Sequence, residues 1–388
     1  DIYMHKQEDN MKIAITTFHR AYNYGAVLQC YALYHSLKEL GHECYVLDYW
    51  PKYFYNQYYV HADFSITHPP IKTWINHLRI KKVLDERNKG FEKFLEEHLK
   101  LFPVDINDGQ ISVKNNKFDL YVTGSDQVWN DRCARFDRNY FLNFPSAKES
   151  NRASYAASFG LKKIPENLRE EYKNRLNGFE AYSVRESDGK NILEDLLGVV
   201  ASVNCDPTLL LSQYDWNDVA SNDLDLSDPY VLVYYVTKTN ELQKQAYAYA
   251  KKNGYKLVVL PCNMGIDVLT GKNDKSLDAE LRLSASPADF LSLFKNASYV
   301  FTNSFHGTVF SLLYHKQFSS QIRLDGNKQN SRALNLLHQV GLIPKNFDTD
   351  AFSTDVNTDW KLVDSNIATM RREGLNYLSA ITKSKGVE

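Results

Sequence analysis

Short apolar runs alternate with amphipathic stretches along the first half of the chain. Residues 12–17 form an apolar run, and residues 26–40 carry apolar positions at helical spacing until Gly41 ends them. A second apolar run follows directly over residues 44–48. This order is typical of a parallel β-α-β unit. The same pattern predicts further elements: strands at 118–122, 152–156 and 181–184, and a helix at 165–176.

A polar stretch over residues 212–229 separates this half from a second series of the same kind. It is rich in Ser, Asp and Asn and ends at Pro229, as a linker does. Beyond it the pattern predicts strands at 230–236 and 256–260 and helices at 241–253 and 287–294. The sequence therefore predicts an α/β fold of two Rossmann-like domains with a cleft between them, at residues 11–211 and 230–355.

Three segments are less regular. Residues 49–59 are aromatic, contain Pro51 and fit neither period, so we expect a loop or lid there. Residues 71–99 are charged and helical with an interrupted apolar stripe, which favours a pair of helices.

Residues 358–384 have helical spacing. Two-domain glycosyltransferases of the B fold end in a helix that crosses back to the first domain, and the segment 356–388 resembles that arrangement; a helix that covers the second domain alone is the alternative.

Composition and charge narrow the classes of protein. A chain of 388 residues exceeds the roughly 250–300 residues that one hydrophobic core supports, which favours two domains. A formal net charge of -1 provides no field for nucleic acid or a membrane surface. The cysteines have no paired spacing, so we expect buried thiols rather than a zinc site or disulfides: Cys30, Cys44, Cys133, Cys205 and Cys262.

The chain has no apolar run of the roughly 18 residues that span a bilayer. Residues 1–10 lack the apolar centre of a signal peptide. We therefore expect a cytoplasmic protein, with residues 1–10 as a tag or a disordered extension.

The stretch most informative about chemistry is residues 299–313, which reads as a buried strand, a polar turn and a helix. The turn contains Ser304, His306 and Gly307. In open α/β sheets ligands bind beyond the carboxyl ends of the strands, and the following helix directs its free N–H groups into that crevice. The layout predicts an anionic ligand beside His306. A histidine packed in the core is the alternative.

Six separated blocks follow one another in the order typical of a known family. They are FHRAYNYGAVLQ at 18–29, TGSDQVWN at 123–130, SVRE at 183–186, CDPT at 205–208, SFHG at 304–307 and KQNSR at 328–332. Together they resemble the polysaccharide pyruvyl transferase family, from roughly residue 11 to the end of the chain. The resemblance implies a transferase that moves the enolpyruvyl unit of phosphoenolpyruvate onto a sugar and closes it into a cyclic ketal.

The donor, phosphoenolpyruvate, presents a carboxylate and a phosphate, which the planar fork of arginine binds well. By resemblance, Arg185 corresponds to an arginine that holds phosphoenolpyruvate, and His306 to a histidine associated with its binding, with Ser304 and Gly307 in the same block. An ion pair at the surface is the alternative for Arg185. Arg332 and Lys328 lie at a predicted helix start and would complete the phosphate site, unless they belong to a solvated face.

Two turns of the first domain would face the acceptor. Asn23 and Gly25 occupy the first strand-to-helix turn, where starting the helix is their alternative use. Ser125, Asp126 and Gln127 follow a later strand and form a set suited to sugar hydroxyls. Asp126 would be an acceptor ligand or general base, or else a helix cap, and either Asp126 or His306 would carry protons.

We expect phosphoenolpyruvate and a saccharide acceptor as partners, with no nucleic acid, no metal and no cofactor beyond the donor. A lipid-linked acceptor would bring the protein to the inner face of the membrane. Phosphate-loop motifs of the GxGxxG and GxxxxGK[ST] kinds do not occur. Acidic pairs at 223–225 and 348–350 lie in polar connecting segments and not after strands. The alternatives are a nucleotide-sugar glycosyltransferase of the same architecture and a carbohydrate-binding protein.

Overall fold

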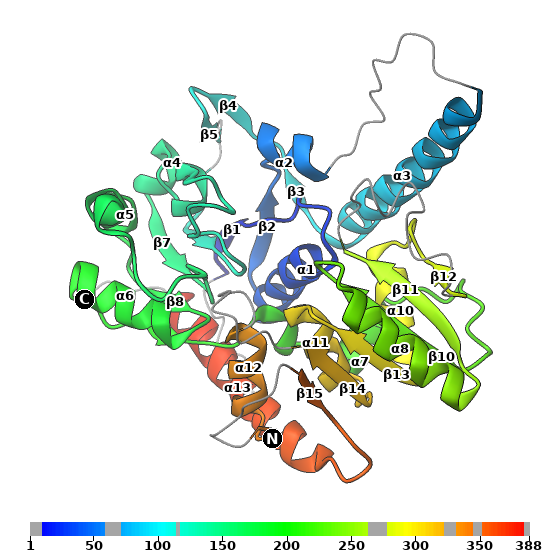
Figure 1. Cartoon of the computed structure of the whole chain (residues 1–388). Coiled ribbons are helices and arrows are strands. Elements are labelled where there is room, and N and C mark those ends of the chain that lie inside the picture. Colours follow the sequence, from blue (N-terminus) through cyan, green and yellow to red (C-terminus); the bar gives the residue numbers. More distant parts are fainter. Residues whose placement is uncertain are drawn as a thin grey trace, which may run out of the picture.

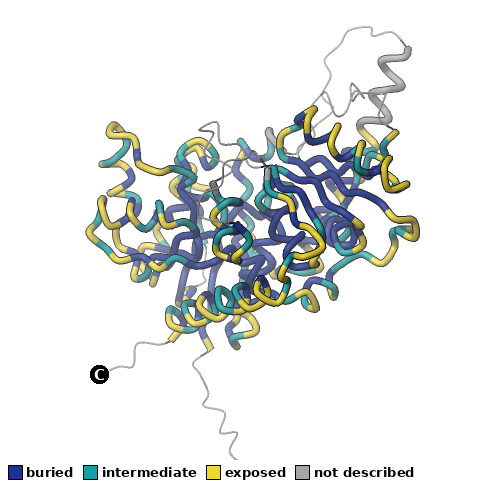
Figure 2. The backbone as a smooth tube through the Cα atoms, turned by 60° about the horizontal axis from the view of Figure 1, so that its bottom comes forward, coloured by how far each residue is buried: buried dark blue, intermediate teal, exposed yellow. Residues whose placement is uncertain are grey.

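The computed structural model of the chain describes residues 10–58, 71–113, 117–262, 278–321, 331–343 and 351–383. Two separate sheets, the first parallel and the second mainly parallel, follow one another along the chain (Figure 1). Their strands are buried inside a shell of helices that are partly exposed (Figure 2). The predicted α/β fold with two Rossmann-like units is therefore confirmed.

The first sheet has the order β3-β2-β1-β6-β7, and all of its strands are parallel. Along β1, Ile13 and Ile15 pack into one apolar cluster while Ala14 packs into another on the opposite face, as alternating strand residues do. The chain reverses its direction of travel across the sheet between β1 and β6, which creates a switch point there. The strand bounds are β1 Lys12–Thr16, β2 Glu43–Leu47, β3 Leu101–Phe102, β6 Leu120–Thr123 and β7 Asn151–Ser154.

Beyond β7 the sheet is extended by a short parallel pair, β8 Ser183–Val184 and β9 Ser202–Val203. Two single bridges, Ala153 to Ala181 and Ala157 to Val184, join this pair to the chain at and just beyond β7. A hairpin of β4 Asp105–Asn107 and β5 Gln110–Ser112 stands apart. The helices of this part include α1 Tyr24–Glu39, α4 Pro145–Lys148, α5 Arg169–Leu176 and α6 Ser187–Leu197, with short 3-10 turns η1 Arg138–Phe141, η2 Glu166–Leu168 and η3 Pro207–Leu209.

The second sheet repeats the plan in the order β12-β11-β10-β13-β14-β15, with only β15 antiparallel. Its switch point lies between β10 and β13. The strands are β10 Tyr230–Tyr235, β11 Lys256–Pro261, β12 Glu280–Leu281, β13 Tyr299–Thr302, β14 Phe318–Gln321 and β15 Ala351–Ser353. The helices are α8 Asn240–Asn253, α10 Pro287–Asn296, α11 Phe305–Leu313 and α12 Ser331–Gln339.

Two sequence predictions about the first part were wrong. The expected loop at 49–59 contains helix α2, Lys52–Tyr58. Pro51 precedes this helix, where it is tolerated, and Phe54 is buried against Phe18. The expected pair of helices at 71–99 is one helix, α3 Ile71–His98. Gly90 lies within it because a Cβ there would come within 2.9 Å of Ser286, so this glycine serves close packing and does not end the helix.

The last helix, α13 Trp360–Ile381, returns to the first part of the chain (Figure 1). The hydroxyl of Tyr377 donates to the carbonyl of Ser154 at 2.9 Å, and the guanidinium of Arg371 donates to the carbonyls of Leu209 and Leu211. These contacts confirm the predicted crossing of the C-terminal helix. None of the described helices is long and apolar enough to cross a membrane.

The polar segment at 212–229 is more than an open connection, because it contains helix α7, Gln213–Asp218. A reciprocal capping box between Ser212 and Asp215 starts the helix. Trp216 is fully buried and its ring contacts both Tyr31 of α1 and Phe310 of α11. The indole therefore joins the two parts of the chain.

Removing this indole will destabilise the protein. Replacing a buried tryptophan by alanine costs about 3–5 kcal/mol, from lost transfer free energy and the remaining cavity. We expect Trp216→Ala to lower the free energy of unfolding in urea by about that amount, and Trp216→Phe by less because a ring remains. A loss below about 1 kcal/mol for the alanine variant would mean that α7 does not hold the two parts together.

Candidate functional site

Most of the predicted site residues lie at the carboxyl ends of parallel strands, close to the two switch points. Asn23 starts the helix after β1, and Asp126 lies in the turn after β6. Arg185 follows β8 directly, and His306 lies in the first turn of α11 after β13. The structure brings these turns from both parts of the chain together.

Arg185 is held by carboxylates on two of its three nitrogens. Its Nε donates to Glu186 Oε1 at 3.0 Å and its Nη1 to Asp206 Oδ2 at 2.8 Å. Burial alone would lower the pKa of Arg185, but the neighbouring carboxylates raise it above its ordinary value. The third nitrogen, Nη2, is buried and has no hydrogen-bond partner among the described residues; Asp126 Oδ1 lies 3.9 Å away. One face of a fixed cation is thus left for a ligand.

Asp206 is a central residue of the site that the sequence-based selection missed. It follows β9, is 1% exposed, and accepts at Oδ1 from the backbone N–H and the hydroxyl of Thr208. Its Oδ2 contacts Arg185 and lies 3.6 Å from His306 Nε2. The available signal was the CDPT block directly after a short strand, which contributed to the family resemblance but not to the candidate residues.

The pKa of Asp206 is strongly displaced. Burial would raise this pKa, but the imidazole of His306, 3.6 Å away, and the charge of Arg185 hold it well below its ordinary range. Asp206 is therefore a fixed negative charge between a guanidinium and an imidazole.

This displacement predicts a loss of stability in acid. The unfolded chain binds a proton at the ordinary pKa of about 3.9, whereas the folded carboxylate stays ionised to lower pH. The contribution of Asp206 is complete above about pH 5 and falls by about 1 kcal/mol at about pH 3. The measurement is urea unfolding of the wild type and of Asp206→Asn at about pH 5 and about pH 3. We expect the free energy of unfolding to fall by about 1 kcal/mol more in the wild type than in the variant. Equal falls in both proteins would contradict the prediction.

His306 belongs to the second part of the chain and contacts the first part on two edges of its ring. It is 8% exposed and lies in the first turn of α11, whose N-terminus is capped by the hydroxyl of Ser304 accepting from the Gly307 N–H. The ring directs Nε2 toward Asp206, and this nitrogen has no hydrogen-bond partner within the described ranges. The Nδ1 edge lies against the first turn of α1, where a Cβ on Gly25 would overlap the imidazole. Gly25 is thus needed for the close approach of His306.

Asn23 and Gly307 have structural functions in addition to any contact with substrate. The Asn23 Oδ1 accepts from the N–H groups of Gly25 and Ala26, so it caps α1. The space left by the missing side chain of Gly307 is taken by Thr302 and Tyr234. The glycine lets α11 pack closely on its own sheet.

The turn after β6 contains three predicted site residues, which differ in burial and in their hydrogen-bond partners. Ser125 is fully buried; its hydroxyl donates to the Ala156 carbonyl at 2.9 Å and lies 3.3 Å from Asp206 Oδ2. Gln127 accepts from Asn130 at 3.0 Å. The Asp126 side chain is 17% exposed, and no helix follows it, which removes the alternative of a helix cap.

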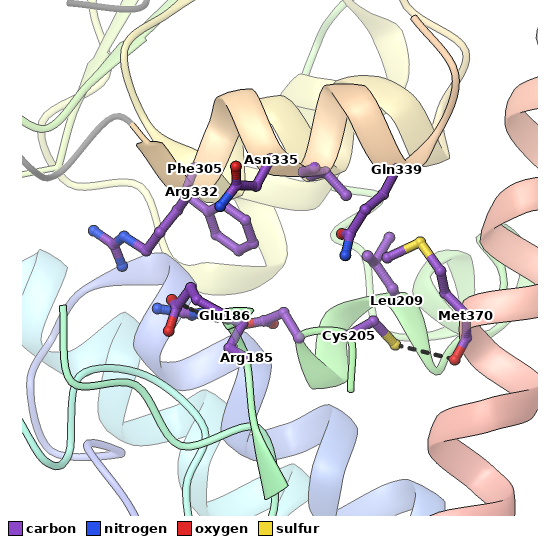
Figure 3. Close-up of a pocket in the computed structure, with 11 residues that line it drawn as sticks. Arg185, Glu186, Cys205, Leu209, Phe305, Arg332, Asn335, Gln339 and Met370 are labelled. Carbon is purple, nitrogen blue, oxygen red and sulfur yellow. Dashed lines mark hydrogen bonds and ion pairs between the residues drawn. The ribbon is translucent and has the colours of Figure 1, made fainter. Parts of the chain in front are cut away.

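A pocket opens beside Arg185, with about 300 Å³ of empty space including its mouth (Figure 3). Two arginines lie at one end: Arg185 and Arg332 lie 4.9 and 6.0 Å from the ring centroid of Phe305. His306 does not line the pocket and connects to it through Asp206. Asn335 lies beside Phe305 and Arg332, and the other end of the pocket is lined by Cys205, Leu209, Gln339 and Met370 (Figure 3).

Arg332 lies in the first turn of α12, as predicted, and faces the pocket. Burial, and then the positive charge of Arg185, lower its pKa below the ordinary value. Two guanidinium groups that repel each other in one pocket indicate a site for an anion. Lys328, the other predicted phosphate ligand, lies outside the described residues.

Neighbouring charged residues are engaged in pairs of their own. Arg20 donates to both oxygens of Asp48, at 2.7 and 2.8 Å, and His19 Nε2 lies 3.3 Å from the same carboxylate. Over the ranges that the structure describes, no three His, Cys, Asp or Glu side chains form a group that could hold a metal ion. The acidic pair at 348–350 lies outside these ranges.

The sequence profile described as polysaccharide pyruvyl transferase matches residues 23–319, more than half of the chain. The chain belongs to the polysaccharide pyruvyl transferase family. Membership makes it a transferase with a saccharide acceptor, and the matched region contains Asn23, Arg185 and His306. No curated protein matches this family member in sequence.

Solved structures similar to this family member cover nearly its whole length. They include the UDP co-structure of MnaA from S. aureus, at 10% identity and a TM-score of 0.47, over 96% of this chain and 91% of that one. UDP-GlcNAc 2-epimerase from Neisseria meningitidis bound to UDP-GlcNAc has 12% identity and a TM-score of 0.43, over 97% and 94%. E. coli ADP-heptose LPS heptosyltransferase II has 10% identity and a TM-score of 0.38, over 94% and 99%. These likenesses concern the fold alone.

Proposed function

We propose that this family member transfers the enolpyruvyl group of phosphoenolpyruvate to a sugar and closes it into a cyclic pyruvate ketal, with release of phosphate. One observation carries the proposal. Arg185 Nη2 and His306 Nε2 are both buried and lack hydrogen-bond partners in the described part of the chain, and both side chains approach the same oxygen of Asp206. Buried donors without partners are costly, and an anionic ligand would satisfy them.

The pocket supports a small donor with two anionic groups. Phosphoenolpyruvate has a carboxylate and a phosphate, and Arg185 and Arg332, both near the ring of Phe305, offer one guanidinium for each. The empty space beside Arg185 is about 300 Å³ with its open mouth included, so the enclosed part of the pocket is smaller than that. That size suits a three-carbon donor better than a nucleotide sugar.

The proposed reaction begins with a proton added to the methylene carbon of phosphoenolpyruvate, which leaves a cation at the central carbon. One sugar hydroxyl attacks that carbon and loses its proton. A second hydroxyl of the same sugar then displaces phosphate, and its proton leaves with the phosphate. His306 or Asp126 would carry the protons, and the buried site would keep water from the cation. No cofactor beyond the donor is required.

Asp126 is the best placed of the proposed acceptor ligands. Its side chain is partly exposed and lies 3.9 Å from the free nitrogen of Arg185, so a sugar that it binds would lie beside the donor. Ser125 is fully buried and would act through Asp206. Whether the acceptor is lipid-linked is decided by assay and not by these residues.

The test is to incubate the purified protein with phosphoenolpyruvate and a panel of lipid-linked glycans. We expect release of inorganic phosphate and a glycan mass increase of one pyruvate minus one water. His306→Ala should abolish both, while His42→Ala, which replaces an equally buried histidine (8% exposed, like His306), should not. Thermal stabilisation by a nucleoside diphosphate, with none by phosphoenolpyruvate, would instead support a nucleotide-sugar glycosyltransferase.

A further inference from the structure

Asp206 occupies an unexpected place for an acidic residue. It lines a pocket that has two arginines at one end, and its carboxylate is 2.8 Å from Arg185. A fixed negative charge beside an anion site opposes binding of the anion. Donor affinity therefore does not explain why a carboxylate is there.

The contacts of Asp206 connect four turns of the fold. Oδ1 is held by the backbone and hydroxyl of Thr208 in η3, and Oδ2 faces the Ser125 hydroxyl after β6, the Arg185 guanidinium after β8, and the His306 imidazole in α11. The carboxylate is 1% exposed and has donors on both oxygens. The carboxylate is thus held in one position, from which it can orient the Arg185 guanidinium and the His306 imidazole, which come from different parts of the chain.

The imidazole has little freedom on its other edge. Its Nδ1 side lies against Gly25 at the start of α1, so Nε2 is the edge that faces Asp206. A carboxylate beside one ring nitrogen favours the N–H form at that nitrogen and sets the orientation of the ring. Asp206 can therefore present His306 Nε2 as a donor next to the Arg185 guanidinium.

We infer that Asp206 is a positioning residue that orients both Arg185 and His306 and serves turnover rather than donor affinity. This inference rests on the proposed function. Ser125, which was expected to bind substrate, donates instead to the same oxygen of Asp206, Oδ2, at 3.3 Å. Its backbone N–H donates to Gln29 at 2.9 Å, which fixes the turn that carries the hydroxyl.

The decisive variant is Asp206→Asn, which keeps the shape of the side chain and removes its charge. With phosphoenolpyruvate and p-nitrophenyl β-galactoside or β-mannoside as probes, we expect kcat to fall about 100-fold while KM for phosphoenolpyruvate stays the same or decreases. Asp137→Asn is the matched control, because Asp137 is a carboxylate bonded to Tyr49 and Asn139 away from the pocket. A raised KM with unchanged kcat would overturn the inference.

A second readout does not depend on the acceptor. In protein labelled with ¹⁵N-histidine, with signals assigned by His306→Ala, we expect the ring resonances of His306 to move in Asp206→Asn and not in Asp137→Asn. Identical His306 signals in Asp206→Asn and the wild type would refute the positioning role. If the wild type neither binds phosphoenolpyruvate by calorimetry nor uses it, the proposed function fails, and the resonances still decide whether Asp206 orients the ring.

A double-mutant cycle tests the place of Ser125. If its hydroxyl acts through Asp206, Ser125→Ala will lower kcat about tenfold in the wild type and have little effect in the Asp206→Asn background. Equal effects in both backgrounds would show that Ser125 acts independently, and would remove it from the inference.

Discussion

Replacing Arg185 by alanine is expected to reduce kcat/KM for phosphoenolpyruvate about 1,000-fold. Truncating one partner of a buried, hydrogen-bonded charge pair in a binding site typically costs about 2–5 kcal/mol of binding free energy, and a 1,000-fold change corresponds to about 4 kcal/mol. The loss has two causes. The ligand loses its guanidinium, and Asp206 and Glu186 are left as uncompensated negative charges at the anion site. Phosphate release at varied donor concentration measures the effect.

Two further variants separate loss of the site from loss of the fold. Arg152→Ala is the matched control, because Arg152 is as buried as Arg185, at 8% exposed against 7%. It lies near the amino end of β7, whereas Arg185 follows the carboxyl end of β8. It should keep its activity per folded molecule. Arg185→Lys keeps a positive charge without the planar fork, so we expect an intermediate loss, mainly in KM. Activity of Arg185→Ala within tenfold of the wild type would refute the donor assignment.

Replacing Gly25 by alanine is expected to lower kcat/KM about 100-fold without destabilising α1. Alanine is favoured over glycine within a helix by about 1 kcal/mol, so the helix itself should not suffer. The added methyl group, however, would occupy the space of the His306 ring and displace it from Asp206. Thermal melting and phosphate-release kinetics on the same samples check both halves of the prediction.

A cycle with His306→Ala shows whether the methyl group acts through the imidazole. In the absence of the ring, Gly25→Ala has nothing to displace and should cause no further loss. Additive losses would mean that Gly25 matters for another reason, such as backbone contact with substrate. That result would restore the role that the sequence first indicated for Gly25.

Prediction from sequence worked well where the cause is local. Apolar runs and the glycines or polar turns that end them located most strands of the two sheets, though not β3, β12, β14 or β15, so the positions of Arg185 and His306 at strand ends could be anticipated. It was less successful for residues 49–59 and 71–99. There the decisive contacts, Phe54 with Phe18 and Gly90 with Ser286, join residues distant in sequence and leave no periodic signal.

For the candidate site too, the features with a local cause could be predicted from the sequence, and those that depend on contacts between distant residues could not. From Arg185, His306 and a helix start, the sequence predicts an anionic ligand. The selection missed Asp206, although the CDPT block that contains it contributed to the family resemblance. Its importance depends on the meeting of the turns after β6, β8, β9 and β13.

By itself the sequence determined two α/β units, the strand ends at which polar residues emerge, and membership of the family. Only the tertiary structure decided that Arg185 and Arg332 share a pocket, that His306 reaches it through Asp206, and that Gly25 makes room for the imidazole. The physical reason is range. Backbone periodicity and capping act over a few neighbouring residues, whereas burial, charge pairing and steric fit act between side chains that only the packing of the two sheets brings together.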